Sequence, residues 1–99
     1  MGRYLATFEA NDSFLPSDPK EIGALMSKMA EITKQSMKEG KTTDWGMFLG
    51  GGKGYIIFEG TAQEMLQEAQ KYAPYVLFHV QEVLSFEDIL MGMGAAPSS

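Results

Sequence analysis

The stretch that most constrains the fold is DWGMFLGGGKGYIIFEG, residues 44–60. Two segments rich in strand-forming side chains flank the run GGGKG, in which four of five residues are glycine. Glycine adopts the positive φ angles that tight hairpin turns require. The stretch therefore predicts two strands, at residues 41–49 and 55–59, joined by a turn at residues 50–54.

One strand and one helix are predicted before this hairpin. Residues 3–10, RYLATFEA, alternate loosely between apolar and polar and end in the breaker run NDS, which favours a strand. Asp18 then begins a helix as its N-cap, with Pro19 at the first position. Gly40 is expected to end the helix as its left-handed cap.

One helix and one strand are predicted after it. Thr61 and Glu64 form a capping box that begins the second helix, and Pro74 closes that helix. The apolar run at residues 75–83 predicts the fourth strand, and residues 85–90, SFEDIL, predict a short helical turn that caps the sheet.

The element order predicts an α+β chain of the ferredoxin-like βαββαβ kind. Right-handed crossovers place the two helices on one face of an antiparallel four-stranded sheet in the order 4-1-3-2. The 99 residues suffice for one domain with a small core. We expect that domain over residues 1–91, followed by a flexible tail over residues 92–99.

Composition excludes several classes of function. A net charge of −5 disfavours nucleic acid and anionic membrane surfaces as partners. With no cysteine there is no thiol nucleophile and no thiolate metal site. The first residues, MGRYLATFEAND, lack the apolar run of a signal peptide, and no stretch approaches the length of a membrane span, so a cytoplasmic location is expected.

The two faces of the sheet are predicted to differ, because strand residues alternate between faces. The set expected against the helices is uniformly apolar: Ala6, Phe8, Ile56, Phe58, Val76, Phe78 and Val80. The opposite set mixes large apolar with polar side chains: Arg3, Leu5, Thr7, Glu9, Trp45, Met47, Tyr55, Ile57, Glu59, Leu77, His79, Gln81 and Val83. A solvated face does not normally carry so much apolar surface. We therefore expect a homodimer through this open sheet face.

Several motifs resemble the dimeric α+β-barrel superfamily, which includes muconolactone isomerases, YciI-like proteins and small antibiotic-biosynthesis monooxygenases. They are Trp45, the glycine-rich hairpin, FEG at 58–60, TAQE at 61–64, and Pro74-Tyr75 leading into VLFHVQEVLSFEDI. The resemblance implies two sheets that face each other as a barrel, with ligands inside it or between sheet and helices. It carries over no complete catalytic set.

His79 and Glu59 are the candidate catalytic residues. His79 is the single histidine, and histidine is the usual acid, base or metal ligand near neutral pH. The alternative is a histidine satisfied by a neighbour such as Thr7. Glu59 in a partly apolar cavity would suit a general base, but an ion pair with Arg3 on the adjacent strand is the alternative. Glu9, at the other end of this face, is expected to be solvated.

The candidate ligand-binding residues are Thr7, Trp45, Tyr55 and Gln81. Trp45 and Tyr55 could form a wall for a flat ligand, or could pack a dimer interface. The run GGGKG does not fit a phosphate-binding loop, because Lys53 is followed by Gly54 and a strand. No metal site and no cofactor are predicted, although a haem would require His79 as its axial ligand.

Three hypotheses follow for the function. The first is a homodimeric binding module for a small, partly aromatic ligand. The second is a cofactor-free isomerase or monooxygenase of the muconolactone-isomerase type. The third is a structural domain with no ligand. An enzyme would place two polar groups within hydrogen-bond reach inside an enclosed cavity, a binding module needs only the cavity, and a structural domain would show a filled interface.

Overall fold

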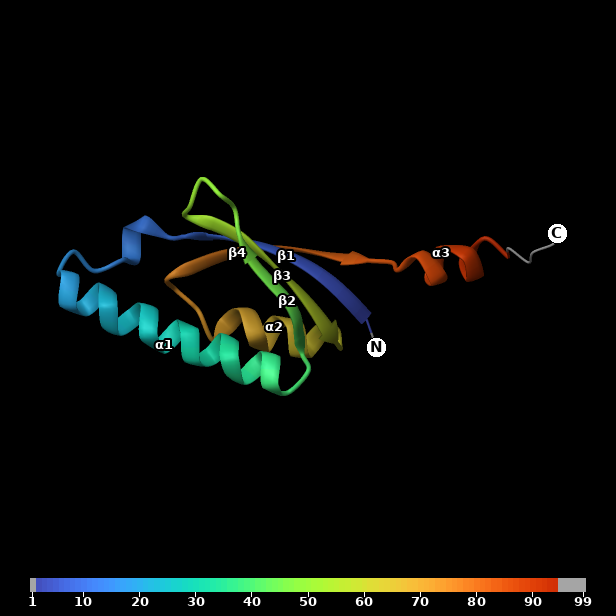
Figure 1. The fold of residues 1–99 in the computed structure, drawn as a ribbon, viewed down its shortest axis with the longest axis horizontal. Coiled ribbons are helices and arrows are strands. Elements are labelled where there is room, and N and C mark those ends of the chain that lie inside the picture. Colours follow the sequence, from blue (N-terminus) through green and yellow to red (C-terminus); the bar gives the residue numbers. More distant parts are fainter. Residues whose placement is uncertain (1, 95–99) are drawn as a thin grey trace.

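The computed structural model describes residues 2–94 and shows an α+β fold built on one four-stranded antiparallel sheet (Figure 1). Its elements are β1 (Gly2–Ala10), the 3-10 helix η1 (Asp12–Phe14), α1 (Pro19–Lys38), β2 (Thr42–Met47), β3 (Lys53–Gly60), α2 (Ala62–Gln70), β4 (Val76–Val83) and α3 (Phe86–Gly92). The strand order is β2-β3-β1-β4, which is the predicted order counted from the other edge. The architecture is compatible with the ferredoxin-like arrangement, with α3 as an additional helix.

Helix α1 begins and ends where the sequence predicts. The Asp18 side chain accepts a hydrogen bond from the Lys20 backbone N–H at 3.1 Å, and Pro19 occupies the first helical position. At the other end Gly40 has a φ of +76°, the left-handed conformation that glycine adopts without strain. Local capping chemistry therefore sets the bounds of this helix.

Helix α2 begins at the predicted capping box. The Thr61 hydroxyl accepts from the Glu64 backbone N–H, and the Glu64 carboxylate accepts from the Thr61 N–H. The same carboxylate forms an ion pair with Lys41, in the connection between α1 and β2. The hydrogen bond from Lys41 lowers the pKa of Glu64 below its ordinary value, and the bond from the Thr61 N–H lowers it further. This ion pair ties the start of α2 to the end of the first helix–strand unit.

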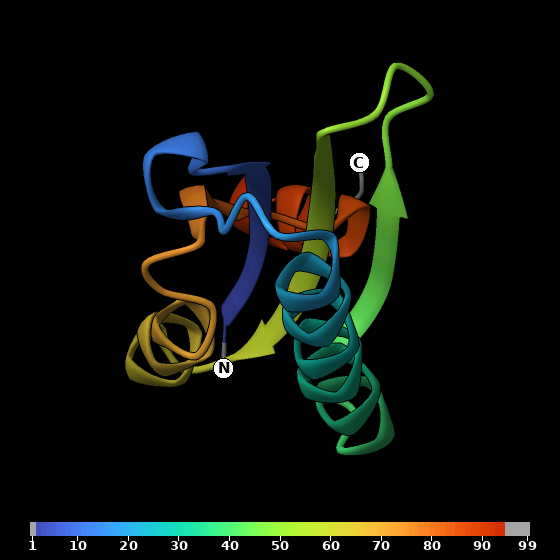
Figure 2. The same cartoon turned by 90° about the vertical axis from the view of Figure 1, so that its left-hand side faces the viewer.

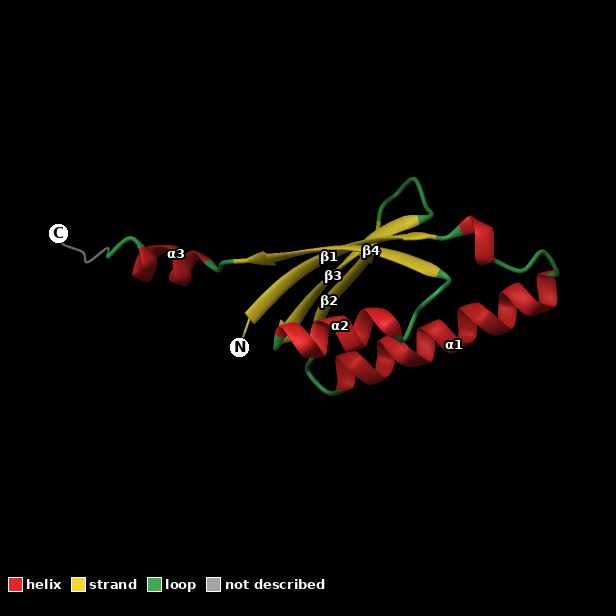
Figure 3. Ribbon diagram, turned by 180° about the vertical axis from the view of Figure 1, so that it is seen from behind, coloured by secondary structure: helices red, strands yellow, loops and turns green. Residues whose placement is uncertain are grey.

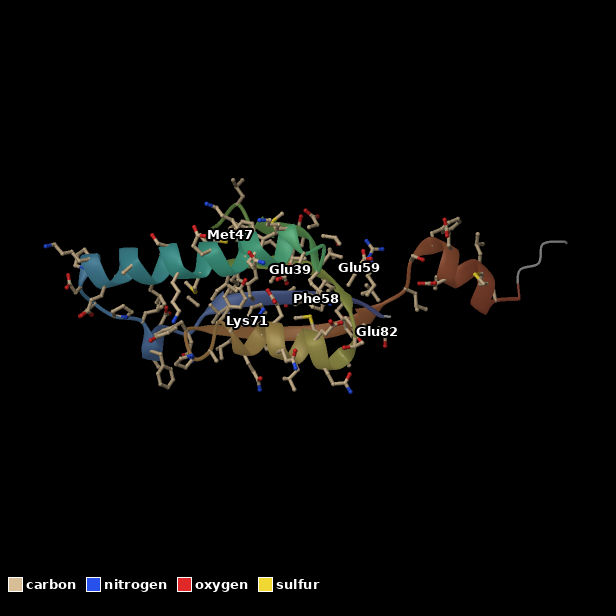
Figure 4. All side chains as sticks on the ribbon, turned by 90° about the horizontal axis from the view of Figure 1, so that it is seen from below. Glu39, Met47, Phe58, Glu59, Lys71 and Glu82 are labelled. Carbon is tan, nitrogen blue, oxygen red and sulfur yellow. The ribbon has the colours of Figure 1, made fainter. Side chains whose placement is uncertain are left out.

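Both long helices lie on the same face of the sheet, and no helix of residues 2–94 covers the opposite face (Figures 2 and 3). The buried apolar core is small: Ala6, Ile56, Phe58, Met65 and Tyr72. Phe58 lies between the two helices when the molecule is seen from their side (Figure 4). Ala6, Ile56 and Phe58 confirm the predicted helix-facing set, but Val80, on the edge strand β4, is 42% exposed and does not belong to the core.

Helix α3 does not cap the sheet, which corrects the prediction for residues 85–90. It continues outward from the end of β4 and extends away from the body of the molecule (Figure 1). The Cα radius of gyration is 16.4 Å, whereas a compact domain of this length has about 13 Å. Gly92 ends α3, so the predicted tail begins inside a helix, and residues 95–99 lie outside the described part of the chain. Among the described helices, none has the length and apolar character needed to cross a bilayer.

Candidate functional site on the open sheet face

A β-bulge in β2 changes which residues of that strand reach the open face. Thr42 lies opposite Phe58, but Asp44 lies opposite Ile57 and Trp45 opposite Ile56, so one extra residue is inserted between Thr42 and Asp44. A bulge of one residue moves every following side chain to the other face. Asp44 therefore belongs to the open face, and Trp45 belongs to the helix-covered face.

The predicted position of Trp45 is therefore wrong. Its ring stacks on Phe8, with centroids 5.9 Å apart, on the face that packs against the helices. Met47, opposite Gly54, lies on that face as well. Within one chain Trp45 cannot share a pocket with Tyr55 or His79, because the sheet separates them.

Three of the predicted site residues form a row across the middle of the open face. Thr7 of β1 lies directly opposite Tyr55 of β3 on one side and His79 of β4 on the other. Opposed residues have Cα atoms about 5 Å apart, so the row spans about 10 Å. Gln81 lies in the next row, opposite Leu5. The structure thus brings together Thr7, Tyr55, His79 and Gln81.

Tyr55 is held in a defined orientation. Its hydroxyl donates a hydrogen bond to Asp44 Oδ2 at 3.0 Å, and Phe48 stacks on its ring with centroids 6.5 Å apart. The ring crosses Gly46, where a Cβ atom would lie only 2.4 Å from the Tyr55 ring. The bond to Asp44 raises the pKa of Tyr55 above its ordinary value, so the phenol stays protonated as a hydrogen-bond donor. Sequence reasoning did not identify Asp44, because the bulge that exposes it was not predicted.

His79 lies near Glu9 rather than near Glu59. Its Nε2 is 3.8 Å from Glu9 Oε1, and the Glu9 carboxylate is also 3.9 Å from Lys53 Nζ. The His79 side chain is 74% exposed in the single chain. The Thr7 hydroxyl points to the His79 backbone carbonyl at 3.5 Å, and not to the imidazole. Glu9 does lie at the other end of this face from Glu59, and its side chain is 38% exposed, but the sequence did not predict that it is the carboxylate beside the histidine.

Glu59 lies at the end of the sheet from which α3 departs, as does Glu82 (Figure 4). It is paired in register with Arg3, four residues along β1 from Thr7. Four residues of strand correspond to about 13 Å, so Glu59 and His79 do not form one proton-transfer pair. The predicted register of Glu59 and Arg3 is confirmed, but no ion pair joins them in the described part of the chain.

A shallow depression follows the edge strand at this site. It is lined by Leu5, Thr7, Phe78, His79, Val80 and Gln81. It combines apolar carbon surface with an imidazole, a hydroxyl and an amide. It lies open to solvent along β4, and it includes neither Glu59 nor Trp45. A second, separate depression lies beside the start of α1 and is lined by Phe14, Pro16, Glu21, Leu25 and Tyr75.

The helix-covered face holds a buried polar cluster that the sequence analysis missed. Glu68 of α2 is only 3% exposed, and its Oε2 has no hydrogen-bond partner in the described part of the chain, while Oε1 lies 3.4 Å from Lys71 Nζ. The Tyr72 hydroxyl is 2.8 Å from the Thr33 hydroxyl of α1. Burial raises the pKa of Tyr72, and the charge of Glu68 adds to that effect. The available signal was the spacing of Met65 and Glu68 on one face of α2, continued by Tyr72 in the turn after the helix, but an acidic residue on such a face is usually assigned to solvent.

The chain matches no protein-family model and no curated protein. Within residues 2–94, no group of three or more histidine or acidic side chains could hold a metal ion. The open face is therefore characterised by its own geometry: a row of hydrogen-bonding groups set in partly apolar surface.

Proposed function

We propose that the protein is a homodimeric α+β-barrel module that binds a small, partly aromatic ligand between the open sheet faces of two chains. The observation that carries this proposal is the composition of the open face. Leu5, Ile57, Leu77 and Val83 supply apolar surface, and the row of Tyr55, Thr7 and His79 crosses it. Ligand pockets in proteins have this character, with mostly apolar walls and a few placed polar groups.

The exposed area of the single chain supports the dimer. The chain exposes 6784 Å², about 1,200 Å² more than a compact monomer of its mass exposes. A standard interface buries about 800 Å² on each partner. The excess is therefore of the size that a second copy would cover.

The resemblance to muconolactone-isomerase-like and YciI-like proteins agrees with this assembly. In that superfamily two such sheets face each other and enclose the ligand space. With the sheets stacked about 10 Å apart, the His79 imidazole and the Tyr55 hydroxyl would point into the enclosed layer. A flat ring with hydroxyl or carboxylate substituents fits a layer of that thickness.

Binding can be measured with catechol and 4-hydroxybenzoate as neutral and anionic aromatic probes. We expect amide resonances of β1, β3 and β4 to shift on titration. Replacing His79 by Gln, or Tyr55 by Phe, should weaken binding about tenfold, because each removes one hydrogen bond to the probe. The control Glu31→Gln lies on the exposed side of α1 and should leave affinity unchanged. Resonance shifts confined to the helix-covered face would contradict the proposal.

A cofactor-free isomerase or monooxygenase is the second candidate, favoured by the distance of 3.8 Å between His79 Nε2 and Glu9 Oε1. An imidazole and a carboxylate within reach of one substrate are sufficient to move a proton, and such distances shorten in enzyme–substrate complexes. In an enzyme of this kind His79→Gln should abolish turnover while the dimer remains intact. Glu59→Gln should have little effect on turnover, since Glu59 lies about 13 Å away along the strand.

A further inference from the structure

Two apolar surfaces protrude from this chain and have no partner among residues 2–94. One is the stripe formed by Phe86, Ile89 and Leu90 of α3 together with its C-cap residue Met93, hereafter the arm stripe. Its spacing of i, i+3, i+4 and i+7 places all four side chains on one side of the helix. All four are exposed, Phe86 to 77%. A helix of seven residues is marginal alone, so this stripe needs a surface to pack on.

The other protruding surface is the hairpin between β2 and β3. Its residues Phe48 and Leu49 are exposed, and Leu49 makes almost no contact with the rest of the described chain, at 106% exposure. The hairpin rises on the side of the sheet away from the helices (Figures 1 and 3). Phe48 is fixed there by its stacking on Tyr55 and by a backbone bond from its N–H to the Lys53 carbonyl at 2.9 Å.

These two surfaces lie at opposite ends of the sheet. The α3 end is marked by the pairing of Arg3 with Val83, and the hairpin end by the pairing of Phe8 with Gly54. Because α3 follows β4 at one edge of the sheet and the hairpin lies at the other edge, the two surfaces occupy diagonally opposite corners. When two copies stack their open faces about a two-fold axis along the diagonal between the other two corners, the strands of the two sheets cross at near right angles. The α3 corner of each chain then lies over the hairpin corner of the other. A two-fold axis then generates the same contact twice.

The arm is acidic, and the hairpin end carries charges of both signs. Residues 76–94 contain Glu82, Glu87 and Asp88 and no lysine or arginine. The hairpin end contributes Lys53, whose side chain is 63% exposed. The Glu9 carboxylate lies 3.9 Å from the Lys53 ammonium group, so the contact with the acidic arm rests on apolar side chains rather than on charge.

We propose that α3 crosses to a second copy of this chain and packs the arm stripe against the hairpin residues Phe48 and Leu49. This rests on the open-face dimer proposed above and extends it. The arm then covers Phe48, which stacks on Tyr55, so each ligand site is closed at one end by α3 of the other chain. The site is incomplete in a single chain for this reason.

Substitutions at the two surfaces test the contact by sedimentation equilibrium. Leu49→Asp and Phe86→Asp each place a charge in the contact and should weaken the dimer at least about tenfold. The matched controls are Met91→Asp, on α3 but off the arm stripe, and Leu66→Asp, on the exposed side of α2. Both controls should leave the dimer constant within about twofold. Circular dichroism should show all four variants folded, because all four positions are exposed in the single chain.

Cysteine pairing tests the same contact between two chains, and the chain has no cysteine of its own. Leu49→Cys chains mixed with Phe86→Cys chains should form a mixed disulfide on mild oxidation, identified by mass spectrometry of the linked peptides. Met91→Cys in place of Phe86→Cys should give much less. A wild-type species of only 10.9 kDa would overturn both the arm contact and the open-face dimer. A dimer insensitive to Leu49→Asp and Phe86→Asp would overturn the arm contact alone, and a cross-linked dimer that binds no aromatic probe would overturn only the ligand proposal.

Discussion

Replacing Gly54 by alanine should be the most damaging of the substitutions in the glycine-rich stretch, although it adds only one methyl group. Gly54 is not a turn residue, because it is the second residue of β3 and is buried. A Cβ atom at this position would lie 2.3 Å from the Gly46 carbonyl oxygen of the neighbouring strand and 2.5 Å from the Phe8 ring. The carbonyl belongs to the backbone, so it cannot move without disturbing the pairing of β2 with β3.

Alanine substitutions at the neighbouring glycines provide a graded series of expected changes in the free energy of unfolding. At Gly50 a Cβ meets nothing within 4 Å, so alanine there should be neutral or stabilise by about 0.5 kcal/mol through the unfolded state. Gly51 has a φ of +79°, and alanine there should cost about 1 kcal/mol. Gly54→Ala adds overpacking against a backbone atom and an aromatic ring, which should cost about 3 kcal/mol.

Urea denaturation followed by circular dichroism, at one fixed chain concentration, measures the three free energies of unfolding. The expected order of stability is Gly50→Ala, then Gly51→Ala, then Gly54→Ala. A Gly54→Ala variant as stable as Gly50→Ala would refute the reasoning. It would mean that β2 and β3 do not approach each other at Gly46 and Gly54 as the structure shows.

Three further outcomes are expected. Thr61→Ala should lose about 1 kcal/mol of stability in urea denaturation. The stability that the Glu64 carboxylate contributes is complete above its ordinary pKa of 4.5 and should disappear as the pH falls through its lowered pKa. A Glu64→Gln variant with an unchanged acid unfolding curve would contradict this. Asp44→Asn should return the pKa of Tyr55 toward 10.0 in an NMR titration. The stability that the hydrogen bond from Tyr55 to Asp44 adds is present below pH 10.0 and is lost as the pH rises through the raised pKa of Tyr55. Glu68→Leu should raise stability by about 1 kcal/mol, because it removes a buried carboxylate oxygen without a partner; a loss of stability would indicate that this oxygen has a partner, such as an ordered water.

The bounds of the helices and the order of the strands could be predicted because their causes are local. Asp18 with Pro19, and Thr61 with Glu64, satisfy the free N–H groups of a helix within four residues of chain, so the same residues act wherever the helix lies. The open-face positions of Thr7, His79 and Gln81 followed from alternation in β1 and β4, which run without a bulge.

The residues that fill the candidate site depended on contacts between distant segments. Thr42 is buried against α1 through a hydrogen bond of 2.7 Å to Ser36, and the bulge that follows turns Asp44 outward to Tyr55 and Trp45 inward to Phe8. Counting alternate residues along the sequence cannot detect an inserted residue. It therefore placed Trp45 and Met47 on the open face, whereas both lie on the helix-covered face.

The sequence by itself therefore determined the elements, their order and one apolar face, because capping, turn and alternation signals act over a few residues. The tertiary structure alone decided which carboxylates meet the site: Glu9 beside His79 and Asp44 beside Tyr55, with Glu59 remote. It also decided that α3 leaves the body instead of capping it. These outcomes depend on strand register and on the surface available to each element, and both are fixed only when the whole sheet has formed.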